Sequence, residues 1–214
     1  MNCRDMLNRT IALGVAFRFE KEHALCVSRL ALRLFDQLQP LHGMGNTERR
    51  WIHAAALLHD IGKKQSPRGH HKMARDIIIG SSELPFRRHE RVMIGLVARY
   101  HRGPLPCKRH SYFGDLEPDD RQYVAKLAAL LRIADGLDKG RAGQVKDLRC
   151  RARSRSVRLT LFGHGAPSII RSLPKADLFE KTFRKRVAIE VETVRGRRRF
   201  GLDSAAGAAY ASIR

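Results

Sequence analysis

The sequence predicts a mainly α-helical protein with a small α/β lobe near its C-terminus. Before Gly143, apolar residues recur at the three- and four-residue steps of amphipathic helices. After Gly143 the period changes to two, which is typical of strands with one buried face. The 214 residues, of which 43% are hydrophobic, can form one domain of ordinary size with a small lobe. We therefore expect a helical domain over 1–142, a lobe over 143–194 and a basic, mobile tail over 195–214.

Two amphipathic helices open the predicted helical domain. The first runs from Phe19 to about Gln37, carries His23 in its first turns, and is followed by the helix-breaking Pro40. The second begins at Thr47, a residue type that caps helix N-termini, and stops at Gly62.

His59 and Asp60 stand side by side in the last turn of the second helix, where the chain leaves the core. Imidazole nitrogens and carboxylate oxygens both bind divalent metal ions. A single His-Asp pair is also common at helix ends that bind no metal. The pair therefore indicates a metal site only if other segments supply further ligands.

Two shorter helices follow, and each offers one candidate histidine. In the first, over about 70–81, His71 shares a face with apolar residues. In the second, from about Arg87 to Tyr100, apolar residues recur at helical steps, and His101 lies four residues after Val97. We expect both histidines to face the core.

A long helix from Tyr123 to about Leu137 carries a carboxylate on its apolar side. Val124, Ala128 and Leu131 form the apolar stripe, and the next residue on that stripe is Asp135. Burial of an unpaired carboxylate costs several kcal/mol, so Asp135 needs a partner.

The predicted lobe consists of a β-hairpin, a helix over about 175–186 and a third strand over 187–192. Along the hairpin, apolar residues alternate with arginines, so that one face is apolar and the other carries Arg149, Arg151, Arg153 and Arg158. Like charges that neighbour each other in a strand pair destabilise it. The arginine face therefore suggests a bound polyanion, and solvated surface arginines are the alternative.

The charge of the chain is unusually positive. The 42 Lys and Arg against 21 Asp and Glu give a formal net charge of +21 and a pI near 11.0. Such a chain attracts nucleic acid, polyphosphate, nucleotides or an anionic membrane surface. A generally arginine-rich surface with no dedicated partner explains the same numbers.

The cysteine pattern and the N-terminus favour a cytoplasmic protein. The short apolar run over 11–17 is followed at once by charged residues, and it is too short to span a bilayer. We therefore expect no membrane association. The cysteines show neither Cys-x-x-Cys spacing nor a disulfide framework, and they are Cys3, Cys26, Cys107 and Cys150.

Five segments thus each offer metal-binding groups near a helix end or on a buried face. The candidates are His23, His59 with Asp60, His71, His101 and Asp135. A single histidine on an apolar face is more often a structural core residue than a ligand, so the hypothesis depends on the whole set. We interpret the remaining histidines as ordinary surface residues, and they are His42, His53, His89, His110 and His164.

The order of these candidates resembles a known superfamily. His23, His59-Asp60 and Asp135 follow the pattern of the HD-domain metal-dependent phosphohydrolases. A closer resemblance is to the helical C-terminal domain of the exopolyphosphatase / guanosine pentaphosphate phosphohydrolase (Ppx/GppA) family. It covers about Arg18 to Val191 and is carried by the stretches Leu34–Leu38, Ala54–Gly62, Val97–Arg102 and Leu127–Asp138.

The chain departs from the Ppx/GppA pattern in three respects. In the family this domain follows two actin-like ATPase-type domains that carry the phosphatase site, so we expect the present chain to be a stand-alone domain. Many family members have lost the HD ligands, whereas this chain keeps the complete set, followed by Lys63. One further family histidine is replaced by Met73.

The resemblance implies a site for one or two divalent ions. His23, His59, Asp60 and Asp135 would hold one Mn²⁺, Fe²⁺, Co²⁺, Ni²⁺, Zn²⁺ or Mg²⁺ ion. A second ion would be held by His71 and His101, with Asp60 as the bridge; otherwise these two histidines would bind phosphate directly.

Basic residues complete the set of site predictions. Asp60 and Lys63 are the catalytic candidates. Cations stabilise the phosphoryl oxygens in phosphoryl transfer. The candidates for this role are Lys63, Arg102, Arg132, Arg149 and Arg151.

Two functions remain open at this point. The first is an HD-type phosphohydrolase that acts on a phosphoanhydride or phosphoester, such as a nucleotide, guanosine penta- or tetraphosphate, or polyphosphate. The second is a non-catalytic module that binds polyphosphate or nucleic acid. A second copy of the chain and a separate phosphatase subunit are further candidate partners.

Overall fold

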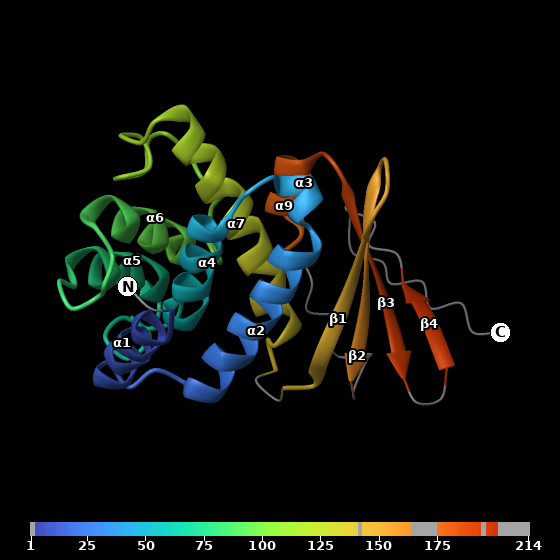
Figure 1. Cartoon of the computed structure of the whole chain (residues 1–214), viewed down its shortest axis with the longest axis horizontal. Helices are drawn as coiled ribbons and strands as arrows, with labels where there is room; N and C mark the ends of the chain where they lie inside the picture. The colour runs from blue at the N-terminus through green and yellow to red at the C-terminus, as the bar shows by residue number, and fades with distance from the viewer. Residues whose placement is uncertain (1–2, 141–142, 164–174, 194–195, 201–214) are drawn as a thin grey trace.

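The computed structural model describes residues 3–140, 143–163, 175–193 and 196–200. In this part of the chain most residues are helical, and a small sheet lies at one side (Figure 1). The helices are α1 (Cys3–Ala16), α2 (Lys21–Gln37), α3 (Gln39–His42), α4 (Asn46–Leu58), α5 (His70–Gly80), α6 (Arg88–Arg99), α7 (Pro118–Leu137) and α9 (Asp177–Phe183). The strands are β1 (Val145–Ala152), β2 (Ser156–Gly163), β3 (Arg186–Thr193) and β4 (Gly196–Phe200).

The predicted helices are present, and the structure adds two that the periodicity did not indicate, α1 and the four-residue α3. The predicted long helix starts five residues earlier than expected, at Pro118. A proline fits the first helical turn because its fixed φ is already helical and its missing N–H has no intrahelical partner there.

α7 is the helix around which the others pack. Every residue from Leu127 to Leu137 is buried, and a helix that is buried on all sides lies inside a protein rather than on its surface. α2, α4, α6 and α9 all contact it, and Figure 1 shows it running between the helical side and the sheet. Asp135 therefore lies in the last turn of the most enclosed helix.

The sheet has the strand order β1-β2-β3-β4. β1 and β2 form the predicted antiparallel hairpin, with Leu148 opposite Leu161 and Cys150 opposite Leu159. β3 pairs in parallel with β2, which requires a crossover connection, and α9 lies within it. β4 pairs antiparallel with β3.

Part of the expected mobile tail over 195–214 falls within the described residues. Gly196–Phe200 is a strand, because a hairpin partner was available in β3 although the segment carries little apolar pattern of its own. Residues 201–214 lie outside the described residues.

Polar contacts attach the sheet to the helical part. Arg33 on α2 forms two hydrogen bonds with Asp147 on β1, at 2.7 and 3.0 Å. The Gln37 side chain donates to the Leu148 carbonyl and accepts from the Cys150 N–H, both at 2.9 Å. Gln37 thus pairs with the outer edge of β1 as a neighbouring strand would, and so covers that edge.

None of the helices in the described ranges combines the length and the apolar character that a membrane crossing needs.

The burial of α7 predicts a large stability effect. Leu130 is fully buried, so Leu130→Ala should leave a cavity and lower the free energy of unfolding by roughly 2–5 kcal/mol. Urea unfolding followed by circular dichroism would measure it. Leu25→Ala, at a position on α2 that is 38% exposed, is the control and should change stability by roughly 0.5 kcal/mol or less. Equal effects of the two substitutions would contradict this packing.

Candidate metal centre

Five helix ends meet at one point inside the helical part. His23 and His70 lie in the first turns of α2 and α5, whereas His59 and His101 follow the last turns of α4 and α6. Asp60 comes directly after His59, and Asp135 lies in the last turn of α7. We call these residues the His/Asp cluster: His23, His59, Asp60, His70, His101 and Asp135.

The first half of the cluster is formed by His23, His59 and the two carboxylates. The Nε2 atoms of His23 and His59 are 3.2 Å apart. Asp135 Oδ1 lies 3.4 Å from the first and 3.6 Å from the second. Asp60 Oδ1 lies 3.9 Å from His59 Nε2. His23, His59 and Asp60 can hold a metal ion, since their ligand atoms all lie within 4.8 Å of one another.

The second half shares Asp60 with the first. Asp60 Oδ1 is 3.2 Å from His70 Nε2 and 3.6 Å from His101 Nε2. These three residues form a second group that can hold a metal ion. One carboxylate thus serves both groups, which is the arrangement of a bridging ligand.

The four imidazoles are all held in the same orientation, through Nδ1. Each Nδ1 lies 2.7–2.9 Å from an oxygen that can only accept, so Nδ1 carries the hydrogen and Nε2 is directed into the cluster. Such outer partners are the usual means of orienting metal-binding histidines. The pairs are His23 with Asp138 Oδ2, His59 with the Ala56 carbonyl, His70 with the Pro67 carbonyl, and His101 with the Ala98 carbonyl.

The electrostatics keep both carboxylates ionised. Burial alone would raise the pKa values of Asp60 and Asp135, but the charges and hydrogen bonds of the surrounding histidines outweigh it and hold both below their usual range. Burial lowers the pKa of His23, whereas its bonds to Asp135 and Asp138 raise it to about 9 overall. Burial lowers the pKa of His101 well below its usual value, so that ring is neutral.

A comparison with protein families shows the family of the chain. The family model "Ppx/GppA phosphatase, domain III" matches residues 8–179, most of the chain. The chain belongs to the Ppx/GppA family. No curated protein gives a significant match.

In this Ppx/GppA domain III, the structure brings together five of the six predicted ligands, and it corrects the sixth. His71 lies outside both groups, and His70 takes the predicted place beside Asp60. Burial, together with the charge of Arg99, lowers the pKa of His71 to about 4.

The helical periodicity of α5 contained the signal for His70. His70, Ala74 and Ile78 are spaced at steps of four, and all three are buried, whereas His71 is only partly buried. The sequence analysis placed His71 on this stripe because the spacing to Ala74 was also compatible with a helix face, at three residues.

Gly62 is not the helix stop that the sequence predicted, since α4 ends at Leu58, but it has a packing role. A Cβ atom there would lie 2.6 Å from the His70 carbonyl oxygen, 2.6 Å from Met73 Cβ and 2.8 Å from the Ala74 nitrogen. No side chain fits in that space, so the glycine allows the first turn of α5 to pack directly against the turn that carries Asp60.

The predicted phosphate-binding cations lie in different places. Arg102 Nη1 is 3.4 Å from His70 Nε2, at the cluster. Lys63 donates instead to Glu20 at 2.8 Å. Arg132 is buried and donates to the Tyr100 and Gly103 carbonyls and to Asp177, so it joins three segments of the fold.

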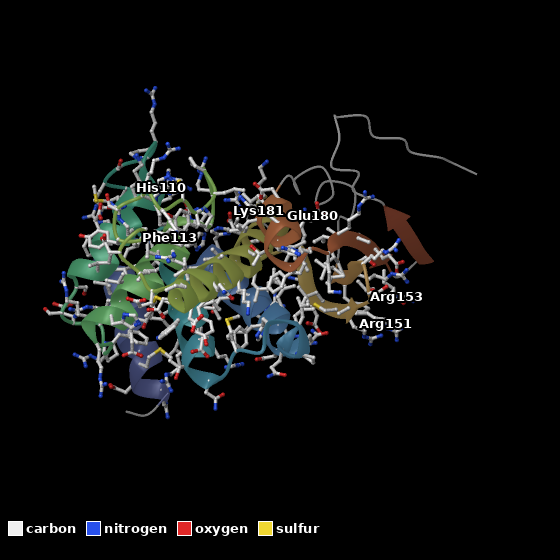
Figure 2. The ribbon with its side chains drawn as sticks, turned by 90° about the horizontal axis from the view of Figure 1, so that it is seen from above. His110, Phe113, Arg151, Arg153, Glu180 and Lys181 are labelled. Carbon is white, nitrogen blue, oxygen red and sulfur yellow. The ribbon has the colours of Figure 1, made fainter. Side chains whose placement is uncertain are left out.

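Arg149 and Arg151 are exposed on the sheet, and no described contact joins either of them to the cluster. Figure 2 shows Arg151 and Arg153 at the far end of the sheet, away from His110 and Phe113 in the helical part. Arg149 stacks over the Phe162 ring at 5.5 Å. These arginines therefore belong to a surface separate from the His/Asp cluster.

Two residues at the cluster had not been identified as candidates. Asp138 orients His23, and its position three residues after Asp135, at the end of the same helix, was a signal for this. Lys175 contacts Asp135 Oδ2, and nothing local in the sequence indicates a contact between residues 40 positions apart.

His42 corrects the interpretation of the other histidines as surface residues. It is buried, and its ring bonds to the Phe35 carbonyl and the Met44 N–H. His53 and His110 are partly buried, whereas His89 is exposed beside Asp120. His164 lies outside the described residues.

The difference between His70 and His71 can be tested directly. His70→Ala should remove one ligand of the second group and lower the number of bound Mn²⁺ ions or the affinity for the weaker one. His71→Ala is the matched control and should leave both unchanged. Isothermal titration with Mn²⁺ would measure them. The assignment of His70 fails if the His71 variant loses metal and the His70 variant does not.

Proposed function

We propose that this domain is an HD-type metal-dependent phosphohydrolase that cleaves a phosphoanhydride or phosphoester. The observation that carries the proposal is the orientation of four buried imidazoles, whose Nε2 atoms all face two ionised carboxylates. Membership of a family described as phosphatases supports the same chemistry.

The donor set fits a divalent ion of the first transition series. It contains imidazole nitrogen and carboxylate oxygen and no thiolate, a combination that suits Mn²⁺, Fe²⁺, Co²⁺, Ni²⁺ or Zn²⁺ and also allows Mg²⁺. His23, His59, Asp60 and Asp135 would hold one ion. His70 and His101 would hold a second, with Asp60 shared. When bound, such ions lower the pKa of a coordinated water and neutralise charge on a phosphoryl group.

The exposure of the ligands indicates from which side a substrate approaches. The His59 and His101 side chains are 0% and 2% exposed, whereas those of Asp60 and Asp135 are 11% and 12% exposed. The carboxylates are thus slightly more exposed than these histidines, and we expect a substrate to approach from their side. Arg102 is exposed beside His70, and we expect it to contact the anionic part of a nucleotide, an alarmone or a polyphosphate.

Metal analysis of purified protein is the decisive experiment. The wild type should bind one or two divalent ions and release phosphate from at least one member of a panel of nucleotides and polyphosphate. Asp60→Ala should lose both ions and the activity, because both groups share that carboxylate. Asp135→Asn should lower metal affinity and keep the fold.

Asp36→Asn provides the control, since Asp36 is a partly exposed carboxylate that pairs with Arg49. It should keep full metal content. A wild type that stays metal-free after reconstitution with Mn²⁺, Fe²⁺, Ni²⁺ and Zn²⁺ would exclude the proposed function.

A second candidate, a polyanion-binding module, is favoured by the arginine face of the sheet. Arg149 and Arg151 are exposed on β1, and Arg153 is exposed in the turn that follows it. Arg158 should contribute less to polyanion binding than expected, because its Nε pairs with Oε1 of Glu190 on β3 at 3.3 Å. A polyphosphate or RNA strand along this face would release counterions, so its binding would weaken with salt.

Replacement of Arg149, Arg151 and Arg153 by Ser should reduce the slope of log affinity against log salt, by roughly 0.7 for each lost phosphate contact on a single strand. Fluorescence anisotropy with labelled RNA and a polyphosphate competitor would measure it. Arg9, Arg50 and Arg88, also exposed, supply a control triple Ser variant with the same change in net charge. Equal slopes for both variants would show that only the total charge matters.

A further inference from the structure

Lys175 is a cation of the C-terminal lobe that reaches the His/Asp cluster. It lies two residues before α9, and its Nζ contacts Asp135 Oδ2. The other oxygen of the same carboxylate faces the Nε2 atoms of His23 and His59. Lys175 and the first group are therefore separated by a single carboxylate.

The position of Lys175 is fixed by a neighbouring ion pair. Asp177, at the start of α9, accepts a hydrogen bond from Arg132 Nη2 at 3.0 Å. Arg132 lies on α7 three residues before Asp135, and its Nη1 holds the Tyr100 and Gly103 carbonyls. This buried guanidinium thus secures the segment that carries Lys175 over the end of α7.

Lys175 has the accessibility that contact with a substrate requires. Its side chain is 21% exposed, so it lies at the margin of the cluster and not beneath it. An ammonium has three N–H donors. One is directed to Asp135, and no hydrogen bond of the other two is recorded among the described residues. Lys63, the lysine that the sequence favoured, is instead directed to Glu20.

We propose that Lys175 binds the non-bridging oxygens of the substrate phosphoryl group at this site. The inference rests on the proposed function and adds to it a substrate-binding residue supplied by the α/β lobe. Negative charge is spread over these oxygens in phosphoryl transfer, and a fixed cation beside them stabilises it. Arg102 lies by the second group and Lys175 by the first, so the two cations would flank the phosphoryl group.

A different role for Lys175 predicts a different result. If the ammonium only balanced the charge of Asp135, it would compete with a metal ion for that carboxylate. Its removal would then tighten metal binding and leave phosphate affinity unchanged. Measurement of both affinities on the same variants separates the two roles without reference to turnover.

The experiment compares wild type, Lys175→Met and Lys175→Arg. Lys181→Met is the control, because Lys181 is an exposed lysine of α9 in the same lobe (Figure 2). Calorimetry would give the affinity for inorganic phosphate with and without Mn²⁺, and the affinity for Mn²⁺ itself. Lys175→Met should weaken phosphate binding roughly tenfold or more, the size expected for loss of a charge-assisted hydrogen bond. Lys175→Arg should recover part of it, and Lys181→Met should bind as wild type does.

Two results would overturn the inference. One is unchanged phosphate affinity in Lys175→Met, and the other is an equal loss in Lys181→Met. A wild type that binds no metal counts against the proposed function alone. Lys175 is then judged on phosphate binding by the metal-free proteins, and equal affinity of wild type and Lys175→Met there refutes its role.

Discussion

The carbonyl groups at helix ends are the constraint on which the site depends. The last turn of an α-helix has C=O groups without intrahelical partners. In α4 and α6 one of these, at Ala56 and Ala98, accepts the Nδ1 hydrogen of the histidine that follows. The same bond that completes the helix end therefore fixes the tautomer of the ring. Because several helix ends converge, the Nε2 atoms of these rings meet in one cluster of potential metal ligands.

Helical periodicity located most of the site, because each ligand lies at the end of an apolar stripe. It was wrong by one residue at His70, where steps of three and four both fit the stripe and only packing decides between them. Periodicity could not reveal Lys175, Asp138 or the pairing of β4, because these depend on contacts between distant segments. It also could not show that His42 is buried, since the ring finds its partners in a turn.

The α/β lobe is joined to the site through one buried arginine. The sequence suggested that Arg132 binds phosphate, yet its guanidinium is occupied by two carbonyls and by Asp177. Its planar fork of donors suits such a junction better than an ammonium would. Arg132 thus ties the end of α6 and the start of α9 to α7, next to Asp135. In the proposed site Arg132 thus has the positioning role, and Lys175 contacts the ligand.

The tight packing around Gly62 means that the size of this residue sets how closely α5 approaches Asp60. A single added methyl group would have to push the first turn of α5 outward, since its contacts there are backbone atoms and a Cβ, which cannot rotate away. Such a wedge would carry His70 away from Asp60, while His23 on α2 and His59 at the end of α4 stayed in place. A substitution at Gly62 would therefore disturb the second group and leave the first intact. The absence of a side chain at Gly62 is what allows Asp60 to lie within reach of both groups.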